Sequence, residues 1–187
     1  MKNAVILHGT DASPDDHWFR WLQGELEERG YSVWLPQLPG AERPSAQRYN
    51  KFLLNGGFGF NEDTILIGHS SGAVSILNLL QVLPGNFMIK ASFLVGAFRG
   101  DLGWNALKEI VEPLDFDKIK SRCGKFIFIH SDDDPYIPLS DAKFLAEKLG
   151  GELVVKKGEG HFNLEASPKY KQFPLLLELI DRETGNT

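Results

Sequence analysis

The sequence contains only one cysteine, Cys123, among its 187 residues. A single thiol cannot form a disulfide bond within the chain, which excludes a fold held together by disulfides. No helix start is expected beside Cys123 that would favour a thiolate, so we expect a partly buried structural thiol. The apolar stretch near the N-terminus, residues 4–7, is shorter than the core of a signal peptide. Together these features favour a cytoplasmic, reduced protein.

Long hydrophobic runs and an excess of basic residues are also missing. No apolar run approaches the ~20 residues that a membrane-spanning helix requires. The chain has 20 lysines and arginines against 25 acidic residues, which gives a net charge of −5. Domains that bind nucleic acid usually carry a basic patch, whereas the basic residues here gather only briefly, at 156–157 and 169–171. We therefore expect no nucleic-acid partner and no membrane partner, and nothing in the sequence indicates the oligomeric state.

Short apolar segments alternate with amphipathic ones along the chain. Hydrophobic residues make up 42% of the sequence and charged residues 24%, which is ordinary for a single globular domain, here residues 1–187. We expect strands at 4–7, 31–35, 64–67, 89–95, 125–129 and 152–155, and helices at 15–29, 45–54, 71–83, 104–111, 139–149 and 170–180. The strands are apolar on both faces, as in parallel sheets covered by helices on both sides. The pattern predicts an α/β fold with about six parallel strands and helices on both faces.

The most informative motif is Gly68-His69-Ser70-Ser71-Gly72, which lies between the strand 64–67 and the helix 71–83. It has the form G-x-S-x-G, in which a sharp turn from strand to helix exposes a nucleophilic serine. The residues two positions before and after that serine have to be small because the turn is tight. The alternative is a glycine-rich turn that cradles phosphate, but neither G-x-G-x-x-G nor G-K-[ST] occurs in the chain. We therefore predict that Ser70 is a nucleophile.

A nucleophilic serine requires a histidine base, and the base requires a carboxylate that orients it. In hydrolases built on such sheets, the chain order is Ser, then Asp or Glu, then His. Among the five histidines, only His161 follows every candidate acid, and it lies in a glycine-flanked loop after the last strand. We predict His161 as the base. The other histidines are expected to shape the turn after the first strand (His8), to lie on the surface (His17), to point away from the substrate (His69) and to pack in the interior (His130).

Three adjacent aspartates, Asp132, Asp133 and Asp134, follow the strand 125–129. The run that starts at Asp134 fits the pattern D-x-x-[VI]-P, which is common after this strand in such hydrolases. Asp134 is therefore the predicted acid, and Asp133 is the alternative. An acidic turn or a divalent-ion site is another interpretation, but no spaced series of ligands such as D-x-D-x-D is present. We predict neither a metal nor a cofactor.

Developing negative charge on the substrate has to be stabilised by backbone N–H groups. One usually belongs to the residue after the nucleophile, here Ser71, and the second to the loop after the first strand. That loop reads His8-Gly9-Thr10, so we predict Thr10 as the second donor. The segment 96–124 leaves little room for a lid. Phe98 and Trp104 within it either line a shallow substrate pocket or pack beneath a crossover helix, and both interpretations stay open.

These motifs together resemble the α/β-hydrolase superfamily, and within it the small serine hydrolases that include a retinoblastoma-binding branch. The resemblance covers essentially the whole chain. It rests on the early His8-Gly9 strand, on 17–22, on the 68–72 motif, on Asp133-Asp134-Pro135 and on Gly160-His161-Phe162. It implies a compact α/β-hydrolase fold with no separate lid domain and without the two leading strands of larger relatives. It also implies Ser70, Asp134 and His161 as a catalytic triad.

The resemblance implies hydrolase activity on ester-like substrates. We therefore predict a cofactor-independent serine hydrolase that cleaves small carboxylic esters through an acyl-enzyme. An amidase or aminoacyl-type peptidase would use the same triad, and a non-catalytic binding module on this fold is the alternative from another class. The L-x-C-x-E docking motif of the retinoblastoma-binding branch is absent, because Ser121 and Lys125 stand where the motif has Leu and Glu around Cys123. A pocket-protein partner is therefore not expected.

Overall fold

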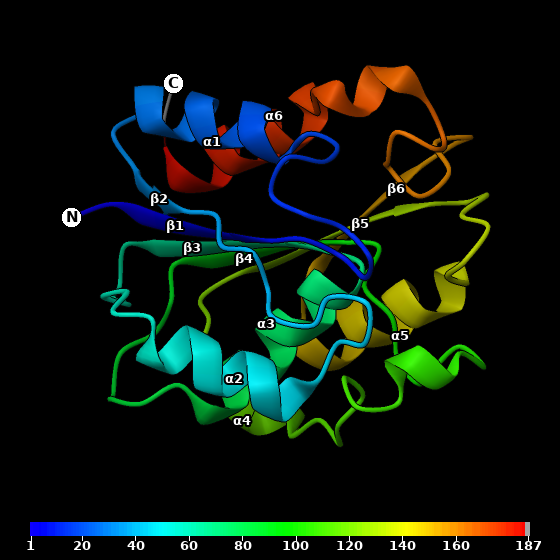
Figure 1. Ribbon diagram of the computed structural model, residues 1–187. Helices are drawn as coiled ribbons and strands as arrows, with labels where there is room; N and C mark the ends of the chain where they lie inside the picture. The colour runs from blue at the N-terminus through cyan, green and yellow to red at the C-terminus, as the bar shows by residue number, and fades with distance from the viewer. Residues whose placement is uncertain (186–187) are drawn as a thin grey trace.

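A computed structural model describes residues 1–185 and places six strands in one sheet within that range (Figure 1). All neighbouring strands are parallel, and their order across the sheet is β2-β1-β3-β4-β5-β6. The strands are β1 (Asn3–Leu7), β2 (Ser32–Trp34), β3 (Thr64–His69), β4 (Ala91–Val95), β5 (Phe126–Ser131) and β6 (Glu152–Lys156). The predicted parallel α/β sheet is thus confirmed.

Helices cover both faces of the sheet. They are α1 (Phe19–Glu28), α2 (Ala46–Asn55), α3 (Ser71–Val82), α4 (Phe116–Lys120), α5 (Leu139–Leu149) and α6 (Pro174–Thr184), with 3₁₀ turns η1 (Asn105–Leu107) and η2 (Pro168–Lys171). Figure 1 shows α1 and α6 on one face and the other helices on the opposite face. Within residues 1–185, none of the helices is long and apolar enough to cross a membrane.

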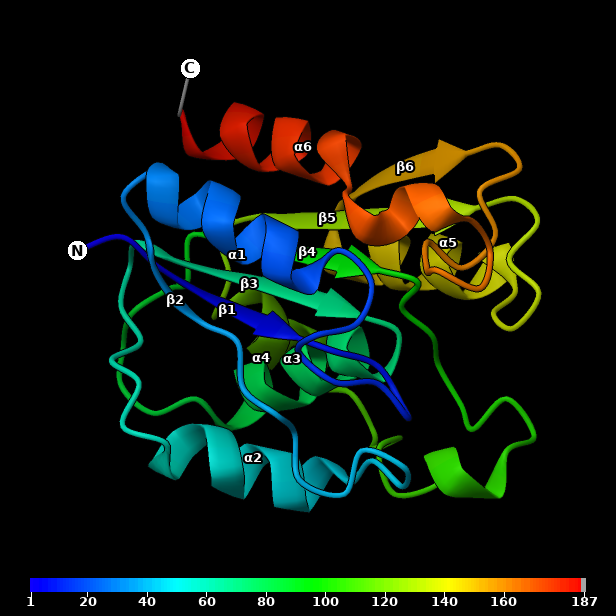
Figure 2. The same cartoon turned by 45° about the horizontal axis from the view of Figure 1, so that its top comes forward.

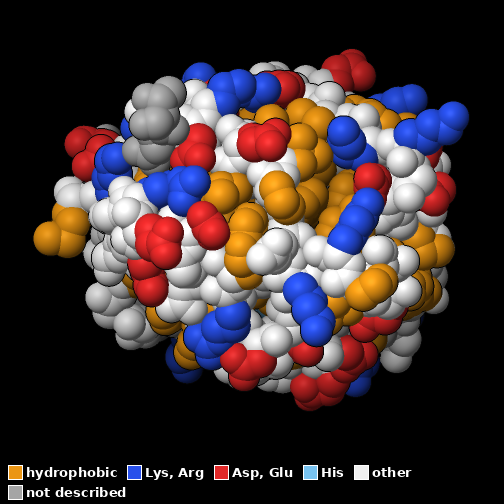
Figure 3. Space-filling model, turned by 90° about the horizontal axis from the view of Figure 1, so that it is seen from above, with side chains coloured by type: hydrophobic (Ala, Val, Ile, Leu, Met, Phe, Trp, Pro, Cys, Tyr) orange, Lys and Arg blue, Asp and Glu red, His pale blue; other side chains and the backbone are white. Residues whose placement is uncertain are grey.

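The two hydrophobic cores follow from the pleat of the strands. Successive side chains of β1 point to opposite faces, so Ala4 and Ile6 pack with α1 and α6, whereas Val5 and Leu7 pack with α2 and α3. Because each face is covered by helices, the central strands carry apolar residues at nearly every position. Figure 3 views the α1 and α6 side, where basic and acidic side chains are interspersed around small apolar patches.

Three predicted helices are wrong in extent. The helix expected at 15–29 begins only at Phe19, because Asp16 closes a turn on Ser13 and His17 has a φ of 52°. The helix expected at 104–111 is reduced to η1, and a separate short helix, α4, precedes β5. The helix expected at 170–180 is divided into η2 and α6, which begins at Pro174, a residue suited to the first helical position.

The segment between β4 and β5 forms no lid domain. It consists of irregular chain with η1 and α4, and it returns directly to the sheet. Figure 2 shows the strand arrows pointing the same way, so that the loops after them gather at one edge. In sheets of this kind, ligands bind beyond the carboxyl ends of the strands. The candidate site residues follow β1, β3, β4, β5 and β6 and therefore meet at that edge.

Candidate active site

Ser70 occupies the turn between β3 and α3, with φ 55° and ψ −122°. This conformation is rare for a residue with a side chain and persists only where its surroundings hold it. Here the Ser70 N–H donates a hydrogen bond of 2.8 Å to the carbonyl of Val95 at the end of β4. The turn therefore presents Ser70 at the carboxyl edge of the sheet, beside the positive end of the α3 dipole.

The two glycines of the motif are required by close backbone contacts. A Cβ atom added at Gly68 would lie 2.6 Å from the backbone nitrogen of Ala73. A Cβ atom added at Gly72 would lie 2.2 Å from the carbonyl oxygen of Leu7 in β1. Both distances are far below any real contact of a Cβ atom. The glycines thus allow α3 to turn sharply after Ser70 and to pack directly on β1.

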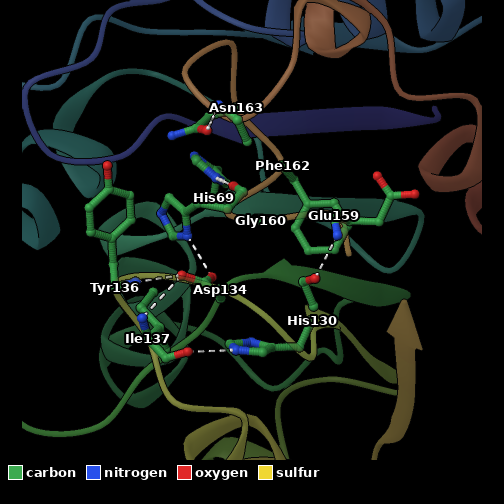
Figure 4. Close-up of polar contacts among 12 residues, drawn as sticks. His69, His130, Asp134, Tyr136, Ile137, Glu159, Gly160, Phe162 and Asn163 are labelled. Atoms are coloured by element: carbon green, nitrogen blue, oxygen red, sulfur yellow. Dashed lines mark hydrogen bonds and ion pairs between the residues drawn. The ribbon is translucent and has the colours of Figure 1, made fainter. Parts of the chain in front are cut away.

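Asp134 and His161 lie in direct contact. The Nδ1 atom of His161 is 2.7 Å from Oδ2 of Asp134, and the Asp134 side chain is fully buried (Figure 4). The other carboxylate oxygen accepts N–H groups of Tyr136 (2.9 Å) and Ile137 (3.1 Å). Burial opposes ionisation of Asp134, but these hydrogen bonds outweigh it and the pKa is lowered. The ionised carboxylate can only accept, so the proton of neutral His161 is on Nδ1 and its Nε2 is available as a base.

The three adjacent aspartates separate in space. Asp132 accepts the N–H of Gly158, and Asp133 accepts the N–H of Gly160 and the hydroxyl of Ser131. Of the two candidate acids, the structure brings Asp134 to His161, whereas Asp133 binds the backbone just before it. The acidic turn therefore holds the loop that carries His161 at three points.

A cavity of about 310 Å³ lies beside the turn of Ser70 and the loop of His161. Ser70 and His161 both line it, together with Thr10, Phe98 and Trp104. Phe98 is buried, whereas Trp104 is 49% exposed and its ring lies 5.9 Å from that of Tyr136. Both aromatic residues left open by the sequence thus contribute to the wall of the cavity.

The two residues predicted to supply the oxyanion donors, Thr10 and Ser71, lie close to Ser70 and contact each other. A Cβ atom added at Gly9 would be 3.1 Å from Cβ of Ser70, which shows how closely the loop after β1 approaches. The next residue, Thr10, donates its hydroxyl proton to the Oγ atom of Ser71 over 3.0 Å. This contact joins the two residues whose backbone N–H groups are the predicted donors.

Residues 4–182 match the serine hydrolase family over nearly the whole chain. The chain belongs to the serine hydrolase family. Among known relatives, it is similar to the hydrolase YdeN of Bacillus subtilis (strain 168), at 29% identity over 163 residues and 86% of each chain. It is also similar to serine hydrolase RBBP9 of Rattus norvegicus, at 29% identity over 167 residues, 85% of this chain and 86% of the relative.

Solved structures agree with this assignment. The crystal structure of the B. subtilis ydeN product matches with a TM-score of 0.90 at 25% identity, covering 100% of both chains. A carboxylesterase structure from Nitrososphaera gargenis matches with a TM-score of 0.77 at 15% identity, covering 100% of this chain and 92% of the other. The first match confirms the α/β-hydrolase fold, and the second shows likeness of fold alone.

His69 of this serine hydrolase, whose side chain is expected from the sequence to point away from the substrate, is buried with its ring next to His161, Trp18 and Phe19. It lines the cavity, and its ring centroid lies 4.6 Å from that of His161. Its Nε2 atom donates to the carbonyl of His161 over 2.8 Å (Figure 4). Burial, followed by electrostatic repulsion from the neighbouring imidazole of His161 when both rings would be protonated, lowers the pKa of His69 well below the ordinary value. His69, the residue before Ser70, is therefore neutral, and its ring holds the backbone of His161 through this hydrogen bond.

The expectation that His17 lies on the surface is wrong. His17 lines the cavity, and its Nδ1 atom accepts the N–H of Leu164 over 3.2 Å. The next residue, Trp18, is fully buried and donates its indole N–H to the carbonyl of Phe162. Both residues thus fix the loop that carries His161. In the sequence, both residues stand just before the first helix, but this position does not reveal their hydrogen-bond partners, which lie far along the chain.

Two further predictions concern buried residues that do not line the cavity, His130 and Cys123. His130 is buried, and its Nε2 atom donates to the carbonyl of Ile137 over 3.0 Å, which holds the turn after Asp134. Cys123 is buried between the hydroxyl of Ser92 and the carbonyl of Lys125. Burial raises the pKa of the Cys123 thiol to about 11. In the structure, both residues support the surrounding chain.

Proposed function

We propose that this serine hydrolase is a single-domain, cofactor-independent carboxylic-ester hydrolase that acts on small acyl substrates. One observation carries the proposal: His161, hydrogen-bonded to buried Asp134, lines the same cavity as the strained turn at Ser70. Nucleophile, base and orienting acid are then available at one place, in the chain order of this fold.

In the proposed reaction, the Ser70 Oγ atom attacks the ester carbonyl carbon while Nε2 of His161 takes the hydroxyl proton. The negative charge of the tetrahedral intermediate falls on the former carbonyl oxygen, where the N–H groups of Thr10 and Ser71 donate to it. The C–O bond to the alcohol then breaks, and the alcohol oxygen receives the proton from His161. An acyl group stays on Ser70.

Water completes the cycle in the proposal. His161 removes a proton from water as the water oxygen attacks the acyl carbon, and the second tetrahedral intermediate expels Ser70, which regains its proton. Asp134 stays ionised throughout and stabilises the protonated ring of His161. The short segment between β4 and β5 and the modest cavity support small acyl groups as substrates. Phe98 and Trp104 would contact the acyl chain.

Labelling with a fluorophosphonate probe tests the nucleophile directly. We expect the probe to modify Ser70, as located by mass spectrometry, and Ser70→Ala to abolish both labelling and ester turnover. Ser140→Ala is the matched control, because Ser140 is an exposed serine of α5 that does not line the cavity. Labelling that persists in Ser70→Ala, or that moves to Ser71, would overturn the assignment. The rates of hydrolysis of an ester and an amide that carry the same acyl group then distinguish esterase from amidase activity.

A further inference from the structure

We propose that His8 is a positioning residue of the active site: its ring holds the Gly9 carbonyl and thereby fixes the direction of the Thr10 N–H. The inference rests on the proposed function, in which Thr10 N–H is one of the two oxyanion donors. His8 would thus contribute to catalysis although it is buried and does not line the cavity.

The hydrogen bonds of His8 determine which ring nitrogen carries the proton. His8 follows the last residue of β1 and is fully buried. Its Nε2 atom lies 2.9 Å from the backbone nitrogen of Leu38. A backbone N–H can only donate, so Nε2 has to be unprotonated. The proton of the neutral ring is then on Nδ1, which lies 2.9 Å from the Gly9 carbonyl oxygen, a group that can only accept.

A neutral ring is also what the surroundings of His8 favour. Burial lowers its pKa, although the hydrogen bond to Gly9 and the charge of Asp16 act in the opposite direction. Protonation would place a second N–H against the N–H of Leu38 and break that contact. His8 is therefore held as one tautomer by two backbone groups from different loops.

The link from His8 to Thr10 is the planarity of the peptide bond. The Gly9 carbonyl and the Thr10 N–H belong to the same peptide unit, and the structure has no cis peptide within its described residues. In a trans unit, the C=O and N–H point in opposite directions in one plane. A hydrogen bond from His8 to the carbonyl therefore directs the Thr10 N–H away from the His8 ring.

The remaining contacts of this loop leave that N–H free for a ligand. In the described part of the chain, the Thr10 N–H has no hydrogen-bond acceptor, although Gly9 and Thr10 both line the cavity. The N–H of Asp11 is bound to Ala41 over 3.0 Å, and the Ala12 N–H reaches the Gly9 carbonyl at 3.4 Å. The shorter bond from His8 is the stronger constraint on the Gly9–Thr10 peptide plane.

Two substitutions separate the two sides of the His8 ring. His8→Asn places an amide NH₂ near the position of Nδ1, so it can still donate to Gly9, but it loses the contact with Leu38. His8→Gln places its amide near the position of Nε2, so its carbonyl can accept from Leu38, but it loses the contact with Gly9. Each variant gives up one hydrogen bond to the backbone, which makes them matched controls for each other.

The kinetic test uses p-nitrophenyl butyrate as substrate and a trifluoromethyl ketone, which forms a tetrahedral adduct with a nucleophilic serine. Removing an oxyanion donor outright typically lowers kcat by about 10²–10³-fold, and misdirecting one should retain part of its effect. We expect His8→Gln to lower kcat by about 10–100-fold with little change in KM, and to weaken ketone binding in parallel with kcat/KM. His8→Asn should keep most of the activity.

Equal losses of kcat in the two variants, or a rise in KM alone, would overturn the proposal, because loosened packing would affect both variants alike. Thermal unfolding of each variant checks that both are folded. A measurement on the wild-type protein needs no substitution: long-range ¹H–¹⁵N spectra of ¹⁵N-histidine-labelled protein report the tautomer. We expect Nδ1–H for His8, and an Nε2–H ring would overturn the proposal. Failure of the proposed function would give a different result from failure of the His8 proposal. The His8 tautomer would be as expected, but the probe would not label Ser70 and no ester would be cleaved. That result would remove the basis of the proposed function and of the role of His8.

Discussion

Exchange of Asp134 for asparagine should give an inactive but folded protein, because the structure dictates how the amide would lie. Oδ1 of Asp134 accepts the N–H groups of Tyr136 and Ile137. An asparagine has only one acceptor oxygen, so that oxygen has to stay with the two backbone donors. Its NH₂ group then faces Nδ1 of His161.

An NH₂ group can only donate, so it selects the His161 tautomer with the proton on Nε2. That nitrogen could no longer take the proton of Ser70. In a chymotrypsin-type triad, the same change lowers kcat by about 10⁴-fold, and we expect a loss of about 10³–10⁴-fold here. This corresponds to about 4–5.5 kcal/mol of lost transition-state stabilisation. The assay is kcat for p-nitrophenyl acetate, with KM measured alongside.

Asp133→Asn is the matched control for Asp134→Asn. One oxygen of Asp133 accepts both the Gly160 N–H and the Ser131 hydroxyl, and an asparagine oxygen can replace it. We expect Asp133→Asn to retain kcat within about tenfold, because His161 keeps its partner. If Asp133→Asn proved crippling and Asp134→Asn mild, the choice of acid would be refuted.

The lowered pKa of Asp134 adds a dependence of stability on pH. A carboxyl group whose pKa is lower in the folded chain stabilises the fold above its unfolded pKa of about 4, and this contribution is lost as pH falls through the lowered value. The free energy of unfolding of Asp134→Asn should therefore differ most from wild type near neutral pH. The difference should shrink below about pH 4. Urea unfolding at several pH values measures it, and a difference that grew on acidification would contradict the reasoning.

Three further predictions concern packing, the thiol and the substrate. Gly72→Ala should lower the free energy of unfolding by about 2 kcal/mol or more, because the new Cβ atom would clash with the Leu7 carbonyl. Gly24→Ala in α1 is the control: the new Cβ atom has open space, so this change should raise the free energy of unfolding by about 0.5–1 kcal/mol. Urea unfolding of both variants measures the difference. Cys123, with a pKa of about 11 against 9.0 for a free thiol, should react with a disulfide reagent at pH 8 about 100-fold more slowly than the unfolded chain; equal rates would contradict its burial. Esters from acetate to butyrate should have higher kcat/KM than octanoate and longer esters, and a steady rise to ten or twelve carbons would instead reveal a deep apolar tunnel.

The sheet and the turn at Ser70 could be predicted because their signals are local. An apolar run such as 64–67 has to be buried on both faces, and the spacing of Gly68 and Gly72 around Ser70 reflects contacts within one turn and one neighbouring strand. The start of α1 could not be predicted in the same way. Asp16 is a good residue for a helix start, but its carboxylate binds Ser13 in the preceding turn instead.

Local sequence patterns could not predict the contacts that hold the loop of His161. His17 and Trp18 contact Leu164 and Phe162, about 145 positions further along the chain. Only the order of the strands in the sheet brings these segments together. The roles of these residues therefore depend on the whole fold, whereas the motif around Ser70 depends on its neighbours.

The five histidines show why only one of them can exchange protons during the proposed reaction. Four of them bind backbone groups, and burial lowers the pKa of each, so they stay neutral near pH 7 and hold loops in place: His8, His17, His69 and His130. His161 alone has a carboxylate partner, Asp134, at its ring nitrogen. In the proposed reaction, the charge of Asp134 would stabilise the ring of His161 as it takes a proton from Ser70. Burial disfavours protonation of the other four rings, and at His8 and His17 protonation would also turn a second N–H group toward a backbone N–H.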